Sequence, residues 1–236
     1  MIMQMTPKRV LLFDIDGTLL DPKDSCPRFL EQAVREVFGI SISMDGFVVA
    51  GKTDWQILTE VMRLAGLSDG EINAKRSAEF AAYARIYAVQ GKDVGMVALP
   101  GVNALLDRLV GHPEFALGLV TGNIHNIVPY KLRSAGLDPS VFAFGAFGDD
   151  HMDRNRLPGI ALERYKEMQG SQVKKENVLV IGDTQRDIAC ARNYGLKAMC
   201  VATGQYSYLD LAGHHPDYLL EDLADTDRVM EIFSRF

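Results

Sequence analysis

Short apolar runs alternate along the chain with longer segments whose apolar residues recur every three or four positions. The runs that predict strands cover residues 10–13, 115–120, 141–147, 178–181, 198–201 and 218–220. Continuous short runs are typical of strands buried on both faces, and their alternation with helices is typical of parallel sheets. The pattern therefore predicts an α/β fold, a doubly wound parallel sheet with helices on both faces.

Residues 22–97 interrupt this alternation with helical signals alone. Ser25 and Gly39 bound one expected helix, and capping-box patterns that begin at Thr53 and Ser68 precede two more. We therefore expect an all-helical module inserted after the first strand. The predicted division is an α/β core domain made of residues 1–21 and 98–236 and a helical domain made of residues 22–97.

Two acidic residues follow the first strand directly. Asp14 and Asp16 stand at its carboxyl end, before Gly17 and Thr18. Side chains two positions apart share a face of a strand, so the carboxylates would repel each other and need a cation or a proton between them. Gly17 allows a sharp turn here. Because α/β sheets bind ligands at the carboxyl ends of their strands, we expect a ligand site at this point.

The second long run ends in Thr121-Gly122-Asn123. A hydroxyl, free backbone N–H groups and a helix N-terminus together suit an anion. Simple capping of the next helix would explain the same residues.

A third strand ends in Gly182-Asp183-Thr184, and Asp187 follows. If the strands are parallel, Asp183 meets the acid pair and Thr121 at one edge of the sheet. An oxygen-rich acidic cluster suits Mg²⁺ rather than zinc. Asp187 either supports this site or matches the dipole of a helix in its first turn.

Composition and charge argue against some classes of function and indicate a cellular compartment. The chain has 25 Lys and Arg against 31 Asp and Glu, a net charge of −6, which argues against general binding to nucleic acid or to an anionic membrane. No apolar run is long enough to span a membrane, and the first ten residues show no signal-peptide core. Three cysteines without metal-type spacing fit a reducing compartment, so we expect a cytoplasmic protein.

Three motifs together resemble a known family. They are Asp14-Ile15-Asp16-Gly17-Thr18, Thr121-Gly122-Asn123 and Gly182-Asp183-Thr184-Gln185-Arg186-Asp187. Their order and spacing resemble motifs one, two and four of the haloacid dehalogenase-like (HAD) hydrolase superfamily, over nearly the whole chain. The helical segment resembles the type-1 cap of the phosphoglycolate phosphatase-like branch, inserted in a Rossmannoid core.

The resemblance implies a role for each motif residue. Asp14 would be the nucleophile that forms an aspartyl-phosphate, and Asp16 the general acid and then the general base. Mg²⁺ would be bound by the carboxylates of Asp14 and Asp183 and by the backbone carbonyl of Asp16. The remaining motif residues would hold the phosphoryl oxygens or support the site: Thr121 as a catalytic residue, Gly17, Thr18, Gly122 and Asn123 at the substrate, and Thr184 and Asp187 behind the metal.

The third motif departs from the family, which usually has a lysine in a Lys-Pro-x-Pro pattern. Aligning Pro158 with the second proline puts Asn155 at the lysine position. We favour Arg154, because an Arg-Asn-x-Leu-Pro version resembles some family members, and Arg156 stays open as a substrate-binding residue. An arginine keeps the positive charge and adds bidentate geometry.

The expected function is that of a Mg²⁺-dependent phosphatase acting on a small phosphorylated metabolite. Lys52 belongs to a segment that resembles the part of such caps that reaches the substrate. Asp16 argues against a halide substrate, since the dehalogenase branch of the family lacks an acid at this position. The alternatives are a phosphoglucomutase-like phosphotransferase and a non-catalytic phosphate-binding regulatory protein. The chain is expected to be a monomer or a homodimer.

Overall fold

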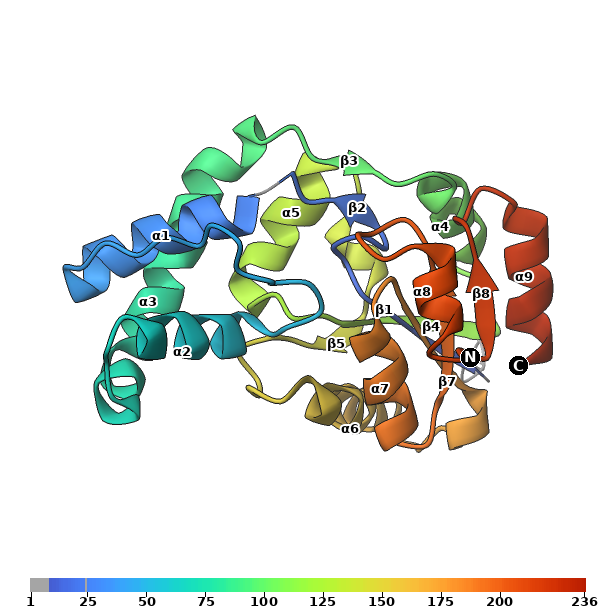
Figure 1. Ribbon diagram of the computed structural model, residues 1–236. Helices are drawn as coiled ribbons and strands as arrows, with labels where there is room; N and C mark the ends of the chain where they lie inside the picture. The colour runs from blue at the N-terminus through green and yellow to red at the C-terminus, as the bar shows by residue number, and fades with distance from the viewer. Residues whose placement is uncertain (1–8, 24) are drawn as a thin grey trace.

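The computed structural model describes residues 9–23 and 25–236 (Figure 1). Six parallel strands form the main sheet in the order β5-β4-β1-β6-β7-β8. The strands are β1 (Arg9–Phe13), β4 (Phe115–Val120), β5 (Phe144–Ala146), β6 (Val178–Gly182), β7 (Lys197–Val201) and β8 (Tyr218–Leu220). The predicted α/β class with a parallel sheet is confirmed.

Helices cover both faces of this sheet. The helices of the α/β part are α4 (Val102–Leu109), α5 (Val128–Ser134), α6 (Leu157–Gln169), α7 (Gln185–Asn193), α8 (Tyr208–Ala212) and α9 (Thr226–Arg235). Leu11 and Phe13 of β1 pack in the same hydrophobic cluster as α4, α5 and α9, whereas Val10 and Leu12 pack with α6, α7 and α8. Alternating side chains of one strand thus serve two cores, which is why the strand sequences are apolar throughout.

The register of the strands brings the predicted site residues to one edge. Phe13, the last residue of β1, is paired with Leu119 of β4 and with Ile181 of β6. All three strands point the same way, so Asp14, Thr121 and Asp183 leave the sheet side by side. The expected meeting of these chain segments is therefore present.

In its described residues, the segment between Asp21 and Val97 contains the α-helices α1 (Ser25–Phe38), α2 (Asp54–Leu64) and α3 (Asp69–Gln90) and a short 3₁₀ helix (Gly91–Asp93), and we call it the helical insertion. Figure 1 shows it beside the sheet rather than on either face. The ends of the segment pair as two short antiparallel strands, β2 (Leu20–Asp21) and β3 (Val97–Ala98). A strand of two residues is too short to show a period, so the sequence pattern predicted neither β2 nor β3. The division into a core and a cap domain stays a prediction.

Local contacts explain other differences from the sequence pattern. The strand expected over residues 141–147 is limited to β5, because Asp138 accepts a hydrogen bond from the backbone of Ser140 and begins a 3₁₀ turn. Thr53 does cap α2, but the Gln56 side chain donates to Glu60 instead of closing the capping box. The residues of the short helix α8 show no clear apolar period, so the sequence analysis did not predict this helix.

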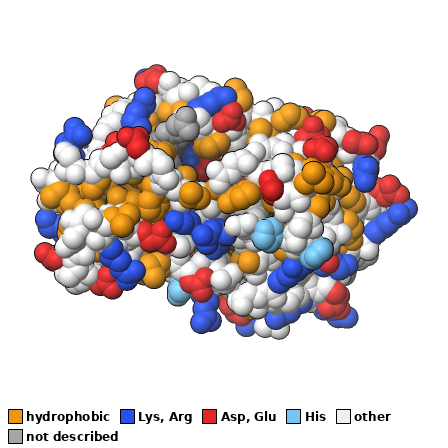
Figure 2. Space-filling view, in the orientation of Figure 1, with side chains coloured by type: hydrophobic (Ala, Val, Ile, Leu, Met, Phe, Trp, Pro, Cys, Tyr) orange, Lys and Arg blue, Asp and Glu red, His pale blue; other side chains and the backbone are white. Residues whose placement is uncertain are grey.

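The surface shows charges of both signs. Figure 2 shows acidic and basic side chains interspersed over the face in view, without a continuous basic area there. Among the described residues, no helix has the length and apolar character that crossing a membrane requires. The expectation about a signal peptide falls on residues that include 1–8, which lie outside the described part.

Candidate active site

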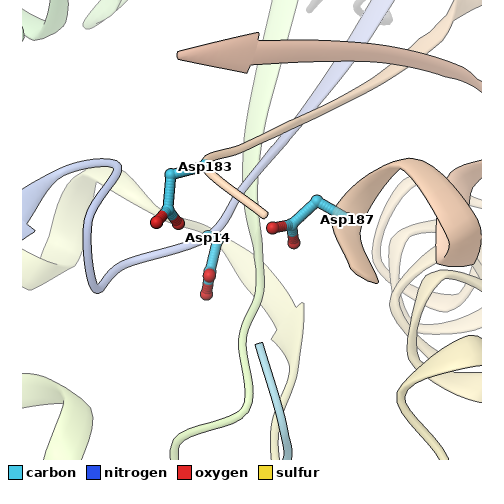
Figure 3. A group of neighbouring side chains, drawn as sticks. All are labelled: Asp14, Asp183 and Asp187. Atoms are coloured by element: carbon cyan, nitrogen blue, oxygen red, sulfur yellow. The ribbon is translucent and has the colours of Figure 1, made fainter. Parts of the chain in front are cut away.

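Three carboxylates meet at the carboxyl edge of β1 and β6. Asp14, Asp183 and Asp187 are buried, and each offers an oxygen within 4.8 Å of the others (Figure 3). Asp14 and Asp183 come directly from strand ends, and Asp187 reaches in from the first turn of α7. The buried acids form a cluster that needs compensating positive charge.

Arg154 supplies part of that charge. Its Nη2 lies 3.0 Å from Oδ2 of Asp14 and 2.6 Å from Oδ1 of Asp187, and the side chain is buried. The short 3₁₀ helix Arg154–Arg156, which Asp153 caps, turns Arg154 inward and leaves Arg156 exposed. Of the two arginines that the sequence left open, Arg154 is the one that contacts the acidic cluster.

The pKa values in the cluster show how strongly the acids interact. Burial raises the pKa of Asp14 to about 6 against the attraction of Arg154, and burial and the neighbouring acids raise that of Asp183 well above its usual range. Burial opposes the protonated form of Arg154, but Asp14 and Asp187 outweigh it and raise its pKa. Three carboxylates against one guanidinium leave excess negative charge, and an all-oxygen donor set fits Mg²⁺.

Asp187 differs from its two neighbours because both of its oxygens already have partners. Oδ1 accepts from Arg154, and Oδ2 accepts from the backbone N–H of Thr184 at 3.0 Å and from its hydroxyl at 2.7 Å. Thr184 and Asp187 form a capping box at the start of α7. This geometry suits Asp187 to orienting Arg154 rather than to binding a ligand directly.

Asp183 lies where two glycines leave room for it. A Cβ atom at Gly17 would stand 2.3 Å from Oδ2 of Asp183, and one at Gly204 would stand 1.7 Å from it. Gly17 also has a φ of +76°, which disfavours other residues. Thr18 donates weakly to Oδ1 at 3.4 Å. The turn after β1 thus packs directly on the third acid.

A second polar cluster surrounds Asp16. Oδ2 of Asp16 accepts from Nδ2 of Asn123 at 2.9 Å and from Nζ of Lys131 at 2.6 Å. Asn123 also donates to the hydroxyl of Thr121 at 2.8 Å. The motif residues Asp16, Thr121 and Asn123 are therefore joined into one hydrogen-bonded group beside Asp14.

The sequence analysis missed Lys131. It lies on the apolar face of α5, four residues after Ile127 and three after Val128, and its side chain is fully buried. A lysine at a core position of an amphipathic helix is the signal that could have revealed it. Its partner could be found only in three dimensions.

The helical insertion closes over this edge of the sheet. The backbone N–H of Asp54 donates to the carbonyl of Gly122 at 2.7 Å, and its Oδ2 accepts from the backbone N–H of Ile124 at 2.8 Å. Thr53 donates to the carbonyl of Met152 at 2.8 Å. A Cβ atom at Gly122 would stand 2.0 Å from the carbonyl oxygen of Lys52, so Gly122 permits this close contact.

The closed insertion leaves a cavity of about 420 Å³ above the acids. Residues predicted as site residues line it: Asp14, Asp16, Gly17, Lys52, Thr121, Gly122, Asn123, Arg154, Asp183 and Thr184. Lys52 pairs with Glu60 at 2.6 Å, and its side chain is 12% exposed. Apolar residues of the insertion, such as Val49 and Ile57, complete the wall.

A buried acid in the insertion gives a prediction about stability. Neither carboxyl oxygen of Glu79 has a partner among the described residues, and burial together with Asp54 raises its pKa well above 4.5. The unfolded chain loses this proton first, so stability should fall by about 1.4 kcal/mol per pH unit from pH 4.5 up to the native pKa. Glu79→Gln should therefore raise the free energy of unfolding at pH 8 by at least about 1.4 kcal/mol, the equivalent of one pH unit, and leave it unchanged at pH 4.

Urea unfolding at the two pH values measures this effect. The exposed acid Glu163, changed to Gln, is the matched control and should show no such pH dependence. Equal stability of Glu79→Gln and the unaltered protein at pH 8 would contradict the prediction.

Residues 11–201 match the family model of haloacid dehalogenase-like hydrolases. The chain belongs to this family. The HAD-like match spans β1 to β7 and includes all three motifs and the insertion, so the family resemblance is confirmed.

Individual HAD-like relatives match along most of their length. The phosphoglycolate phosphatase of Vibrio vulnificus is 28% identical over 92% of this chain and 93% of its own length. The pyrophosphatase PpaX of Oceanobacillus iheyensis is 22% identical over 92% and 94%. The crystal structure of a predicted phosphatase from Clostridium acetobutylicum superposes with a TM-score of 0.69, at 19% identity, over 96% of this chain and 100% of that one.

Proposed function

We propose that this HAD-like hydrolase is a Mg²⁺-dependent phosphatase of small phosphate monoesters. The observation that carries the proposal is the placement of Asp14. Its buried carboxylate is held by Arg154, lies beside Asp183 and faces a cavity that the helical insertion closes. A positioned carboxylate with an acid two residues away has the parts needed for covalent transfer of a phosphoryl group.

The first step would transfer the phosphoryl group to the protein. A carboxylate oxygen of Asp14 forms a bond to phosphorus while the ester P–O bond breaks, and a proton from Asp16 passes to the leaving oxygen. Arg154 and the loop that contains Thr121, Gly122 and Asn123 would hold the non-bridging oxygens. Gly17 and Thr18 would form the other side of this loop site.

The second step would release phosphate and restore Asp14. Asp16, now a carboxylate, takes a proton from water as the water oxygen attacks phosphorus and the aspartyl P–O bond breaks.

The acidic cluster would hold the metal ion. Asp14 and Asp183 would contribute carboxylates and Asp16 its backbone carbonyl, with Asp187 and Thr184 fixing the arrangement from behind. Mg²⁺ would supply charge neutralisation between the attacking carboxylate and the phosphoryl oxygens. The oxygen-only donors and the raised pKa values of Asp14 and Asp183 support a divalent cation here.

The substrate would be small. A cavity of about 420 Å³ suits a phosphate with a compact leaving group, and Lys52 lies on its wall. Relatives named as phosphoglycolate phosphatase and pyrophosphatase support this class. A cytoplasmic setting and a monomeric or homodimeric state stay predictions.

Phosphate release from a substrate panel tests the proposal. With 2-phosphoglycolate, pyrophosphate, glycerol phosphate and glucose 1-phosphate, we expect Mg²⁺-dependent turnover of at least one compound. EDTA should reduce it to background, and excess Mg²⁺ should restore it. Asp183→Asn should raise the Mg²⁺ concentration needed for half-maximal rate about tenfold or more.

Other outcomes of the panel would point to the alternatives. Conversion of glucose 1-phosphate to an isomer without phosphate release would indicate the phosphotransferase. Binding of phosphate without turnover of any compound would indicate the regulatory protein. Turnover that is insensitive to EDTA would contradict the metal requirement.

A further inference from the structure

A buried lysine contacts the proposed acid–base residue. The side chain of Lys131 has no exposed surface, and its Nζ lies 2.6 Å from Oδ2 of Asp16 and 2.7 Å from Oδ1 of Asn123. Burial of an ammonium group costs several kcal/mol unless acceptors surround it closely. An apolar side chain would pack this face of α5 at lower cost, so packing alone does not account for the lysine.

The two oxygens of Asp16 are in different surroundings. Oδ2 accepts from both Lys131 and Nδ2 of Asn123. Oδ1 is buried and has no hydrogen-bond partner among the described residues. Two donors on one oxygen fix the plane of the carboxyl group and so orient the whole side chain.

The helical insertion completes the surroundings of the lysine. The ring of Tyr87 on α3 is centred 5.8 Å from Nζ. Burial raises the pKa of Asp54 on α2 to about 7, and the positive charge of Lys131 opposes this rise, so the two groups interact. Asp54 is also hydrogen-bonded to the backbone of Ile124, which lies next to Asn123. The lysine thus lies between the proton-transfer residue and the docked insertion.

We propose that Lys131 is a positioning residue that holds the carboxyl group of Asp16 in place for proton transfer, and that the docked insertion keeps this arrangement, Tyr87 beside the ammonium group and Asp54 through its contacts with the loop that carries Asn123. This inference rests on the proposed phosphatase function. In the first step the carboxyl proton of Asp16 passes to the departing oxygen as the bond from Asp14 to phosphorus forms and the ester P–O bond breaks. In the second step the carboxylate of Asp16 accepts a proton from the attacking water as the aspartyl P–O bond breaks. Docking of the insertion thereby aligns proton transfer.

Leaving groups of different basicity test the role of Lys131. An alkyl ester such as 2-phosphoglycolate needs a proton on its leaving oxygen, whereas p-nitrophenyl phosphate releases a stable phenolate. In single-turnover experiments with excess Mg²⁺-loaded protein, Lys131→Met should slow alcohol release from the alkyl ester about 100-fold. Release of nitrophenol should change less than about threefold. Lys131→Arg, which keeps a donor, should recover part of the loss.

Two further variants serve as a control and as a substitute for Lys131→Met. Lys166→Met removes an exposed lysine of α6 and should leave both rates unchanged. Asp54→Asn keeps the shape of the side chain and should slow alcohol release relative to nitrophenol release by about tenfold. This variant replaces Lys131→Met in the test if Lys131→Met does not fold.

The outcomes separate this inference from the proposed function. If the unaltered protein releases phosphate neither from any compound of the panel nor from p-nitrophenyl phosphate, the phosphatase proposal fails. If the unaltered protein is active but Lys131→Met slows both esters equally, or neither, Lys131 does not position Asp16. A loss of the alkyl reaction alone supports the inference.

Discussion

Asp14→Asn should abolish turnover while the protein remains folded. An amide is not a nucleophile for phosphorus, so we expect the rate of phosphate release to fall by at least about 10⁴-fold. Stability should not fall with it at pH 8. The native pKa of Asp14 is raised to about 6 from 3.8, so its ionisation makes folding less favourable as pH rises between these values. The neutral amide removes that penalty.

Activity and urea unfolding measured on the same preparation check this expectation. Asp227→Asn is the control, because Asp227 is a highly exposed acid paired with Arg108 on the surface. It should change the free energy of unfolding by less than about 0.5 kcal/mol and leave the rate unchanged. An Asp14→Asn protein that is folded and retains more than a hundredth of the activity would rule out Asp14 as the nucleophile.

Arg154→Met should impair both stability and activity. The substitution removes the cation between Asp14 and Asp187 and leaves two buried carboxylates without it. Removing one partner of a buried ion pair costs about 3–5 kcal/mol, which corresponds to a fall of roughly 10 °C in Tm for a chain of this size. Turnover should fall at least about 100-fold, because the same guanidinium holds the nucleophile and would contact the phosphoryl group.

Two further variants test the prediction for Arg154→Met. Arg154→Lys restores the positive charge of the usual family motif and should keep more activity than Arg154→Met. Arg156→Met, two residues away on the exposed side of the same 3₁₀ helix, should change the free energy of unfolding by less than about 0.5 kcal/mol. If Arg156→Met caused the larger loss of activity, the assignment of the motif-three cation to Arg154 would be wrong.

Some residues of the site could be placed from the sequence, and others could not. Asp14, Thr121 and Asp183 each follow an apolar strand directly. Parallel strands place their carboxyl ends at one edge, so a local pattern was enough to predict that these residues meet. The choice between Arg154 and Arg156 was different, because both occupy the same charged turn and only packing shows which one turns inward.

The sequence by itself determined the α/β class, the parallel sheet, the inserted helices and the acidic edge. These features depend on the periodicity of apolar residues and on neighbours along the chain, which a sequence displays directly. Tertiary structure alone decided the contact of Lys131 with Asp16, 115 positions apart, and the docking of Asp54 on Gly122 and Ile124. Such contacts depend on how helices from distant segments pack against each other, and no local period encodes the partner of a buried charge.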